Sequence, residues 1–312
     1  MSEDRNVDKR VPLAYPVAMG VFLVVMAWNG LLRVEHALVA ALIVACFATP
    51  ASKRFAVLLM PMALIGLFYD VQKVFTLEIP VHVSGPYLLE KALFGIATPD
   101  GKITLNEVFL RWHNDVLDVV TAFPYLTYIF EALALFFYFF IRDRERCWRF
   151  GWVFFGVNLA GLLTNVLYPV APPWYVTEHG FGPALRGAVG HPAAALRFDA
   201  LTGTHVFATL YARESDAFGA MPSLHAAYPL IVALALNRKA PGERWLWRLA
   251  LMYCGLMAFA AVYLQHHYVI DVVAGLAYGL AGHLVVVWVL GRASARKPIP
   301  DEERDREAAT IG

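Results

Sequence analysis

The chain has 312 residues, of which 59% are hydrophobic and 16% are charged, and its formal net charge is +1. An ordinary soluble domain is about 45–50% apolar and about 25% charged, so this composition indicates a membrane protein. The net charge alone says nothing about nucleic acid, and no basic patch with interleaved aromatic residues supports nucleic-acid binding. The three cysteines are scattered and contain no CxxC pair, which argues against a disulfide framework and against a zinc site.

Eight apolar segments follow one another along the chain, and each is a candidate membrane helix: 11–29, 36–49, 55–69, 119–141, 151–168, 223–238, 246–264 and 269–290. A bilayer core needs about 20 apolar residues per helix, so the second and third segments are short and predict a tight hairpin around 50–54. The first segment is followed by Trp28 and Asn29 and not by a small-residue cleavage motif, so it is interpreted as a retained span. The expected fold is an all-α, polytopic membrane protein.

The distribution of Lys and Arg predicts how these helices cross the membrane. With a cytoplasmic N-terminus, most of the 26 basic residues fall on the inner side, as the positive-inside rule requires, and the C-terminus is cytoplasmic too. The loop 169–222 and the mixed polar and apolar segment 70–118 then lie outside, the latter as an amphipathic or re-entrant stretch. The expected organisation has N-terminal helices with this outer segment, a helical bundle and a solvated, disordered tail, over 1–118, 119–290 and 291–312.

Two histidine-containing stretches on that outer side carry the candidate chemistry, "GAMPSLHAAYP" at 219–229 and "QHHYVIDVVAG" at 265–275. His267 and Asp271 are four residues apart, so on a helix they lie one turn apart on one face. A carboxylate that accepts a hydrogen bond from one imidazole nitrogen fixes the tautomer and leaves the other nitrogen available as a base or nucleophile.

The first of these stretches predicts a helix that begins at the site. Pro222 and Ser223 are typical of a helix start, with the serine hydroxyl available as a cap. Two helix N-termini that converge on one point form an anion site. His225 is then placed to protonate a leaving group, and the whole set favours phosphoryl transfer through a covalently phosphorylated histidine.

Two other interpretations of these residues stay open at this point. A histidine at a membrane interface can be a tolerated amphipathic side chain, although an ionisable residue within a span is a functional candidate because its burial is costly. Imidazole and carboxylate groups also suit zinc or iron, so a metal site is the second alternative. It would use His225, His266, His267 and Asp271.

The combination "PSLH" followed by "HHYVID" resembles the second and third signature motifs of the type-2 phosphatidic acid phosphatase and haloperoxidase superfamily. With "YPVAPPWY" at 168–175, the stretches are most similar to the inositol phosphorylceramide synthase branch and its bacterial relatives. "FYDVQKV" at 68–74 and "LLEKALFG" at 88–95 add a weaker likeness. The resemblance implies a six-helix catalytic bundle and no metal or other cofactor. It also implies that His267 is the nucleophile, Asp271 its orienting partner and His225 the general acid.

The sequence departs from the phosphatase pattern of that superfamily. Asn165 and Pro172 occupy the positions of the usual Lys and Arg in the first motif, and Ala260 and Ala261 replace a Ser-Arg pair before the nucleophile. A phosphodiester carries one negative charge and needs less positive charge around it than a phosphate monoester. The departure therefore favours a head group held through a phosphodiester. The missing positive charges around the phosphate can be supplied by arginines of the outer loop if these fold back over the site. We call such a set the phosphate clamp, and its candidates are Arg186, Arg197 and Arg213.

Several residues are candidates for substrate binding. Asp70 closes the third span on the outer side and is a candidate for contact with a sugar-like head group. Trp174 and Tyr175 form either an interfacial aromatic anchor or a lid over the lipid, and the anchor is the preferred interpretation. The full set of expected substrate-binding residues is Ser223, Asn165, Tyr175, Asp70 and Arg213.

We therefore expect a phosphotransferase at the outer leaflet that moves an inositol-phosphate-like head group from a phospholipid donor to a ceramide-like lipid alcohol. A lipid phosphatase that uses water as acceptor at the same histidines is one alternative. The other alternative is a non-catalytic membrane transporter or scaffold that has kept the fold.

Overall fold

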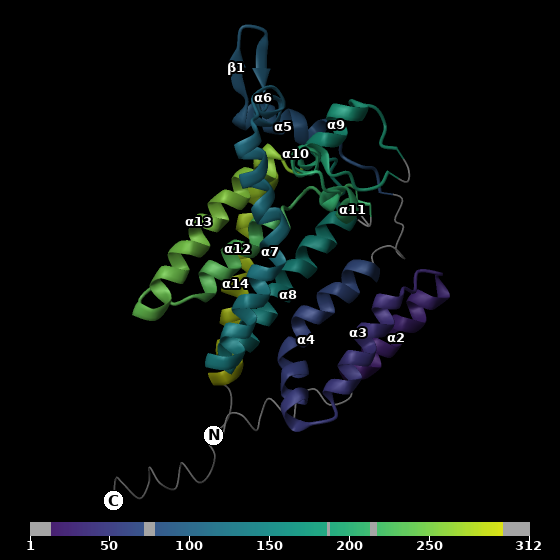
Figure 1. The fold of residues 1–312 in the computed structure, drawn as a ribbon, viewed down its shortest axis with the longest axis vertical. Coiled ribbons are helices and arrows are strands. Elements are labelled where there is room, and N and C mark those ends of the chain that lie inside the picture. Colours follow the sequence, from purple (N-terminus) through teal and green to yellow (C-terminus); the bar gives the residue numbers. More distant parts are fainter. Residues whose placement is uncertain (1–13, 72–78, 186–187, 213–216, 296–312) are drawn as a thin grey trace, which may run out of the picture.

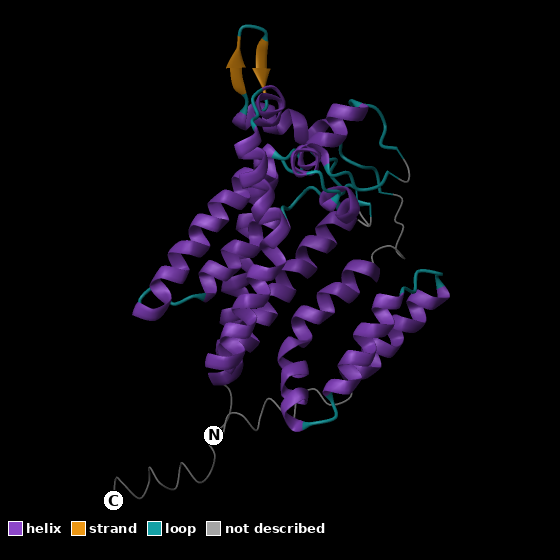
Figure 2. Cartoon of the chain, in the orientation of Figure 1, coloured by secondary structure: helices purple, strands orange, loops and turns teal. Residues whose placement is uncertain are grey.

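The structure is a computed structural model that describes residues 14–71, 79–185, 188–212 and 217–295 (Figures 1 and 2). Each of the eight predicted segments contains an apolar helix. These are α2 (Ala14–Trp28), α3 (Val34–Cys46), α4 (Pro50–Val71), α7 (Asp115–Arg142), α8 (Arg144–Leu167), α12 (Leu224–Ala235), α13 (Pro241–Tyr263) and α14 (Val269–Ala295). Among the described residues, five helices are long and apolar enough to cross a membrane, namely α4, α7, α8, α13 and α14. The helices α2, α3 and α12 are shorter, so the structure supports a membrane protein without establishing eight spans.

Helix α12 occupies the middle of the bundle, where it packs against α7, α8, α13 and α14 (Figure 1). It has only 12 residues. A helix that contacts protein on all sides does not have to match the thickness of the bilayer, because its ends need not meet lipid. Its central place puts the start of α12, and therefore His225, inside the protein.

Glycines allow the helices around α12 to approach closely, as small residues do in membrane helix packing. A Cβ atom added at Gly275 of α14 would lie 2.0 Å from the carbonyl oxygen of Ser223, so only glycine fits there. A Cβ at Gly161 of α8 would lie 2.7 Å from a methyl group of Leu224. These contacts bring the N-terminal ends of α12 and α14 together, and the two histidine stretches with them.

The segment between α4 and α7 forms a cap at one end of the bundle (Figure 1). It consists of α5 (Ser84–Phe94), β1 (Ile96–Thr98), β2 (Gly101–Ile103) and α6 (Leu105–Arg111). The strands pair antiparallel, with Ile96 opposite Ile103, across a turn in which Gly101 has a φ of 115°. The described chain is mostly helical, as predicted, and this short hairpin is a small addition to it. Helix α5 lies within the segment that was predicted to be amphipathic.

The long loop that precedes α12 covers the same end of the bundle as this cap (Figure 1). It contains α9 (Pro173–His179), the short helix η2 (Ala193–Ala195), α10 (Leu196–Thr202) and α11 (Val206–Tyr211). The turns between α3 and α4 and between α12 and α13 lie at the other end (Figure 1). Helix α4 packs along α8 and so attaches the N-terminal helices to the bundle.

Candidate active site

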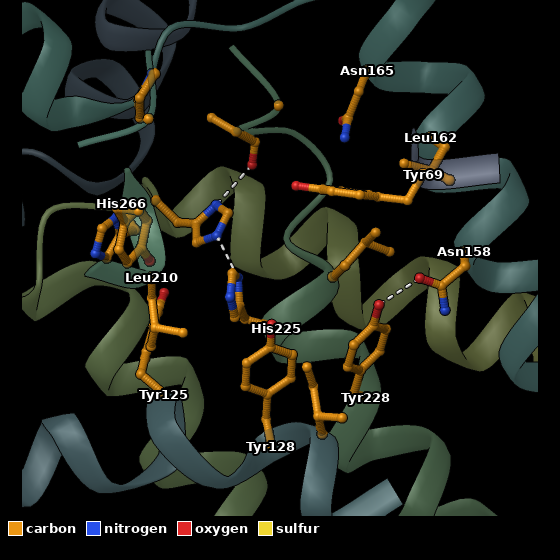
Figure 3. Close-up of a pocket in the computed structure, with 18 of the residues that line it drawn as sticks. Tyr69, Tyr125, Tyr128, Asn158, Leu162, Asn165, Leu210, His225, Tyr228 and His266 are labelled. Carbon is orange, nitrogen blue, oxygen red and sulfur yellow. Dashed lines mark hydrogen bonds between the residues drawn. The ribbon is translucent and has the colours of Figure 1, made fainter. Parts of the chain in front are cut away.

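A cavity of about 560 Å³ lies beneath the outer loops and contains all three histidines of the two motifs (Figure 3). Side chains from α4, α7, α8, α11 and α12 line it together with the loop before α14. Much of the lining is aromatic or aliphatic, and a small number of polar groups point into it. Such a cavity fits an amphipathic ligand, with polar contacts at defined points.

The two predicted catalytic histidines meet in this cavity. The Nδ1 atom of His225 lies 3.2 Å from the Nε2 atom of His267, and the ring centroids are 5.5 Å apart (Figure 3). The convergence expected from the sequence is therefore present. A phosphate group that enters the cavity can contact both rings at once.

The backbone sets the tautomer of His267. Its Nδ1 atom lies 2.8 Å from the carbonyl oxygen of Ala220. Because a carbonyl oxygen only accepts hydrogen bonds, Nδ1 carries the proton and Nε2 presents its lone pair toward His225. Burial lowers the pKa of His267, in the loop before α14, to about 4, with the Ala220 hydrogen bond opposing the shift. The ring is therefore neutral, as a nucleophile must be, at any pH well above 4.

Asp271 has a different role from the one that its spacing predicts. The distance from its Oδ2 atom to Nδ1 of His267 is 4.0 Å, and the Ala220 carbonyl takes the expected place of the carboxylate. Oδ2 instead accepts a hydrogen bond of 2.8 Å from the backbone N–H of Tyr268, and the Asp271 carbonyl accepts one of 2.9 Å from the N–H of Ser223. Asp271 thus fixes the loop that carries His267 and ties it to the start of α12.

Aromatic rings enclose the other two histidines. His225 stacks on Tyr125, with ring centroids 4.5 Å apart, and Tyr128 lies beside it at 4.9 Å. His266 lies between Tyr125 and Tyr211 and stacks on both rings. The described part of the chain contains no group of three His, Cys, Asp or Glu side chains arranged to hold a metal ion.

The loop between α13 and α14, which carries His266 and His267, is the catalytic loop. The cap supports it through residues that were not predicted to belong to the site. Asn106 of α6 donates to the carbonyl oxygens of Val262 and His267, at 3.0 and 3.1 Å. Glu90 of α5 is fully buried, and its carboxylate accepts hydrogen bonds from the backbone N–H groups of Val269 and Ile270 at the start of α14. Burial raises the pKa of Glu90, and the two N–H groups oppose the shift. A lone acid in "LLEKALFG" was the sole sequence signal for this contact.

Two of the predicted substrate-binding residues line the cavity. Asn165 points into it, and its Oδ1 atom has no hydrogen-bond partner within the described ranges (Figure 3). Asp70, at the end of α4, also lines it. Its carboxylate lies 2.6 Å from the guanidinium of Arg33 and 3.0 Å from Nε2 of His36.

The other two described residues that were predicted to contact substrate, Ser223 and Tyr175, do not line the cavity, and their contact with substrate stays a prediction. Ser223 is buried, and its Oγ atom accepts the N–H of Ala226 as the cap of α12. The buried Tyr175 accepts a hydrogen bond from the N–H of Leu185. Its neighbour Trp174 is also buried and lines the cavity, so the prediction of an interfacial anchor is wrong for both rings.

Of the three outer-loop arginines that were candidates for the phosphate clamp, the structure describes one, Arg197. Arg197 forms an ion pair of 2.8 Å with the buried Asp118, which also accepts a hydrogen bond from Tyr263, and it does not line the cavity. The remaining candidates for the clamp, Arg186 and Arg213, lie outside the described residues. Among the described residues that line the cavity, Arg33 is the one Lys or Arg.

Comparison with known proteins matches residues 102–285 to the family model described as the PAP2 superfamily. A phosphoinositol dihydroceramide synthase from Bacteroides thetaiotaomicron is 37% identical over 287 residues, which cover 89% of this chain and 92% of the relative. An inositol phosphorylceramide synthase from Candida albicans is 29% identical over 235 residues, and the chain spans about half of its length, 48%. Inositolphosphotransferase 1 from Saccharomyces cerevisiae is 29% identical over 186 residues, 57% of this chain and 30% of the relative. No solved structure matches the chain. The matched region contains both histidine motifs, and the chain belongs to the PAP2 superfamily.

Proposed function

We propose that the protein is a membrane phosphotransferase that moves a phosphoinositol-type head group from a phospholipid to a ceramide-like lipid alcohol. The observation that carries the proposal is the contact of 3.2 Å between Nε2 of His267 and Nδ1 of His225 in a large, mostly apolar cavity. The names of the relatives support the choice of substrates, because the bacterial relative that matches most of the chain is a phosphoinositol dihydroceramide synthase.

In the first step, Nε2 of His267 attacks the phosphorus atom of the donor. A P–N bond forms, and the bond between phosphorus and the glycerol oxygen of the diacylglycerol breaks. His225 gives its proton to that departing oxygen, and an anionic phosphodiester between the rings favours the protonated form of His225 needed for this. Since Nδ1 of His267 donates to the Ala220 carbonyl, the ring has a fixed partner for the positive charge that develops on it.

In the second step, the lipid alcohol takes the place of the diacylglycerol. Its hydroxyl gives a proton to His225, its oxygen attacks phosphorus, and the P–N bond breaks. The products are the new phospholipid and free His267. Splitting the transfer in this way replaces one difficult displacement by two easier ones.

The orientation in the membrane is part of the proposal. The cap and the outer loop lie at the site end of the bundle, whereas the Arg-rich turn between α7 and α8 lies at the opposite end (Figure 1). The positive-inside rule then places the site on the extracytoplasmic side, with both termini in the cytoplasm.

The proposal is tested by incubating purified protein with phosphatidylinositol labelled in the head group, with and without ceramide or dihydroceramide. We expect a labelled new lipid only when the lipid alcohol is present. Release of water-soluble inositol phosphate as the main product in both conditions would identify a phosphatase instead. Absence of any product, from protein that stays folded, would favour the transporter or scaffold alternative.

A further inference from the structure

Arg33 and Asp70 form a polar pair in the wall of the catalytic cavity. Arg33 precedes α3, Asp70 lies near the end of α4, and both side chains line the cavity that contains His225 and His267. The guanidinium and carboxylate are 2.6 Å apart, with side-chain exposures of 41% and 14%. The pair is therefore accessible to a ligand.

The position of the pair is set by the packing of the N-terminal helices. Helix α4 packs along α8, and its residues Ile65, Gly66 and Tyr69 line the cavity beside Asp70. His36 also contacts the carboxylate, since its Nε2 atom lies 3.0 Å from Oδ2 of Asp70. The family match begins at residue 102, so this wall lies outside the matched region.

The chemistry of the pair fits hydroxyl groups. Within the Arg33 side chain, only the Nη2 atom takes part in the contacts with Asp70 and His36, and the backbone N–H of Arg33 donates to Nδ1 of His36. The Nε and Nη1 atoms have no protein partner among the described residues, so they are donors available to a ligand. Because the carboxylate neutralises the guanidinium, the pair favours neutral oxygen acceptors over a second phosphate. The ammonium group of choline or ethanolamine has no oxygen that can accept from these donors, so such a head group leaves them unpaired.

We propose that Arg33 and Asp70 form a subsite for the hydroxyl groups of the donor's polyol head group, with His36 as a positioning residue for Asp70. This inference rests on the proposed function, since it assumes that the phosphate of the same donor lies at His225 and His267. The subsite makes the N-terminal helices the part of the protein that selects polyol head groups over choline or ethanolamine.

The first test is steady-state transfer from phosphatidylinositol by Arg33→Gln, Asp70→Asn and the double variant. We expect KM for this donor to rise about 10- to 100-fold, as for the loss of hydrogen bonds to charged groups, with a smaller change in kcat. The double variant is expected to lose little more than either single variant, because the two residues act as one unit. The matched control is Arg149→Gln, which removes an Arg–Glu pair of the same 2.6 Å length on the exposed face of α8.

A donor without a polyol, a p-nitrophenyl phosphodiester, separates this subsite from the chemistry. We expect Arg33→Gln to lose much less activity in nitrophenol release than in transfer from phosphatidylinositol. An equal loss with both donors, or an unchanged KM for phosphatidylinositol, would overturn the subsite.

A binding measurement distinguishes failure of the subsite from failure of the proposed function. Glycerophosphoinositol is expected to bind the wild-type protein at least 10-fold more tightly than Arg33→Gln, with glycerophosphocholine as the control ligand. If the wild-type protein transfers phosphoinositol but the variant binds it equally well, the subsite is wrong and the function stands. If binding depends on Arg33 but no transfer occurs, the subsite stands and the proposed function is wrong.

Discussion

The two polar regions of the cavity are built in different ways. At the histidine end, backbone groups hold the reactive side chains, since His267 donates to the Ala220 carbonyl and Asp271 accepts the N–H of Tyr268. At the N-terminal wall, side chains hold one another, as Arg33 and His36 do with Asp70. A backbone partner stays in place when the side chain of its residue is substituted, whereas a side-chain partner is lost with the substitution. The difference suggests that one region fixes the chemistry and the other adjusts the choice of donor.

The largest effect is expected where the packing of the histidine end is broken. In Gly275→Ala the new methyl group meets the Ser223 carbonyl, which would be only 2.0 Å away, so α12 and α14 must separate. We expect loss of transfer from every donor and a lower melting temperature. The control is Gly255→Ala in α13, because a Cβ there has no atom within 4 Å. Full activity of Gly275→Ala would mean that the two helix ends need not be in close contact.

The next effect separates the two histidines by their roles. In His225→Ala no group protonates a poor leaving group, so transfer from an alkyl phospholipid is expected to fall about 10²–10⁴-fold. Nitrophenol departs without a proton, so the first step with a p-nitrophenyl donor, followed as the initial burst of nitrophenol, is expected to keep a rate near that of the wild type. The ratio of the two rates in wild type and variant is the measurement. Equal losses with both donors would assign His225 a role other than that of general acid.

A smaller effect is expected from the cap that supports the catalytic loop. Glu90→Gln keeps one acceptor oxygen for the two N–H groups at the start of α14, whereas Glu90→Ala keeps none. Activity and melting temperature are expected to decrease from the wild type to Glu90→Gln and again to Glu90→Ala. The free energy of unfolding of Glu90→Ala is expected to fall by about 1–3 kcal/mol. Both donors are expected to lose rate equally, in contrast to Arg33→Gln. The exposed Glu145 provides the control, as Glu145→Gln. A loss confined to phosphatidylinositol would place Glu90 in donor binding instead.

The same contrast explains which features the sequence could predict. The helices and the meeting of His225 with His267 follow from apolar segments and from motifs whose order is specific. The hydrogen bond from His267 to Asp271 was expected from helical spacing, but α14 begins at Val269, so His267 lies in the loop and that spacing does not apply. The backbone then places the Ala220 carbonyl nearer.

The contact of Arg33 with Asp70 joins residues 37 positions apart that share no motif. In the sequence, Arg33 is one charged residue in a short connection between two apolar segments. Only the packing of α3 and α4 shows that it reaches the cavity. The role of Asn106 as a support for the catalytic loop was missed for the same reason, because its partners Val262 and His267 are more than 150 residues away.

The most direct test of the central claim is to trap the covalent intermediate. Protein that has reacted with head-group-labelled phosphatidylinositol without acceptor, and is then denatured in base, is expected to carry acid-labile label on His267. His267→Ala is expected to carry none with any donor. His225→Ala is expected to accumulate label with a good leaving group, because its general acid is needed only for a poor one. Label that remains on His267→Ala, or wild-type turnover that never labels the protein, would contradict a phosphohistidine mechanism at this site.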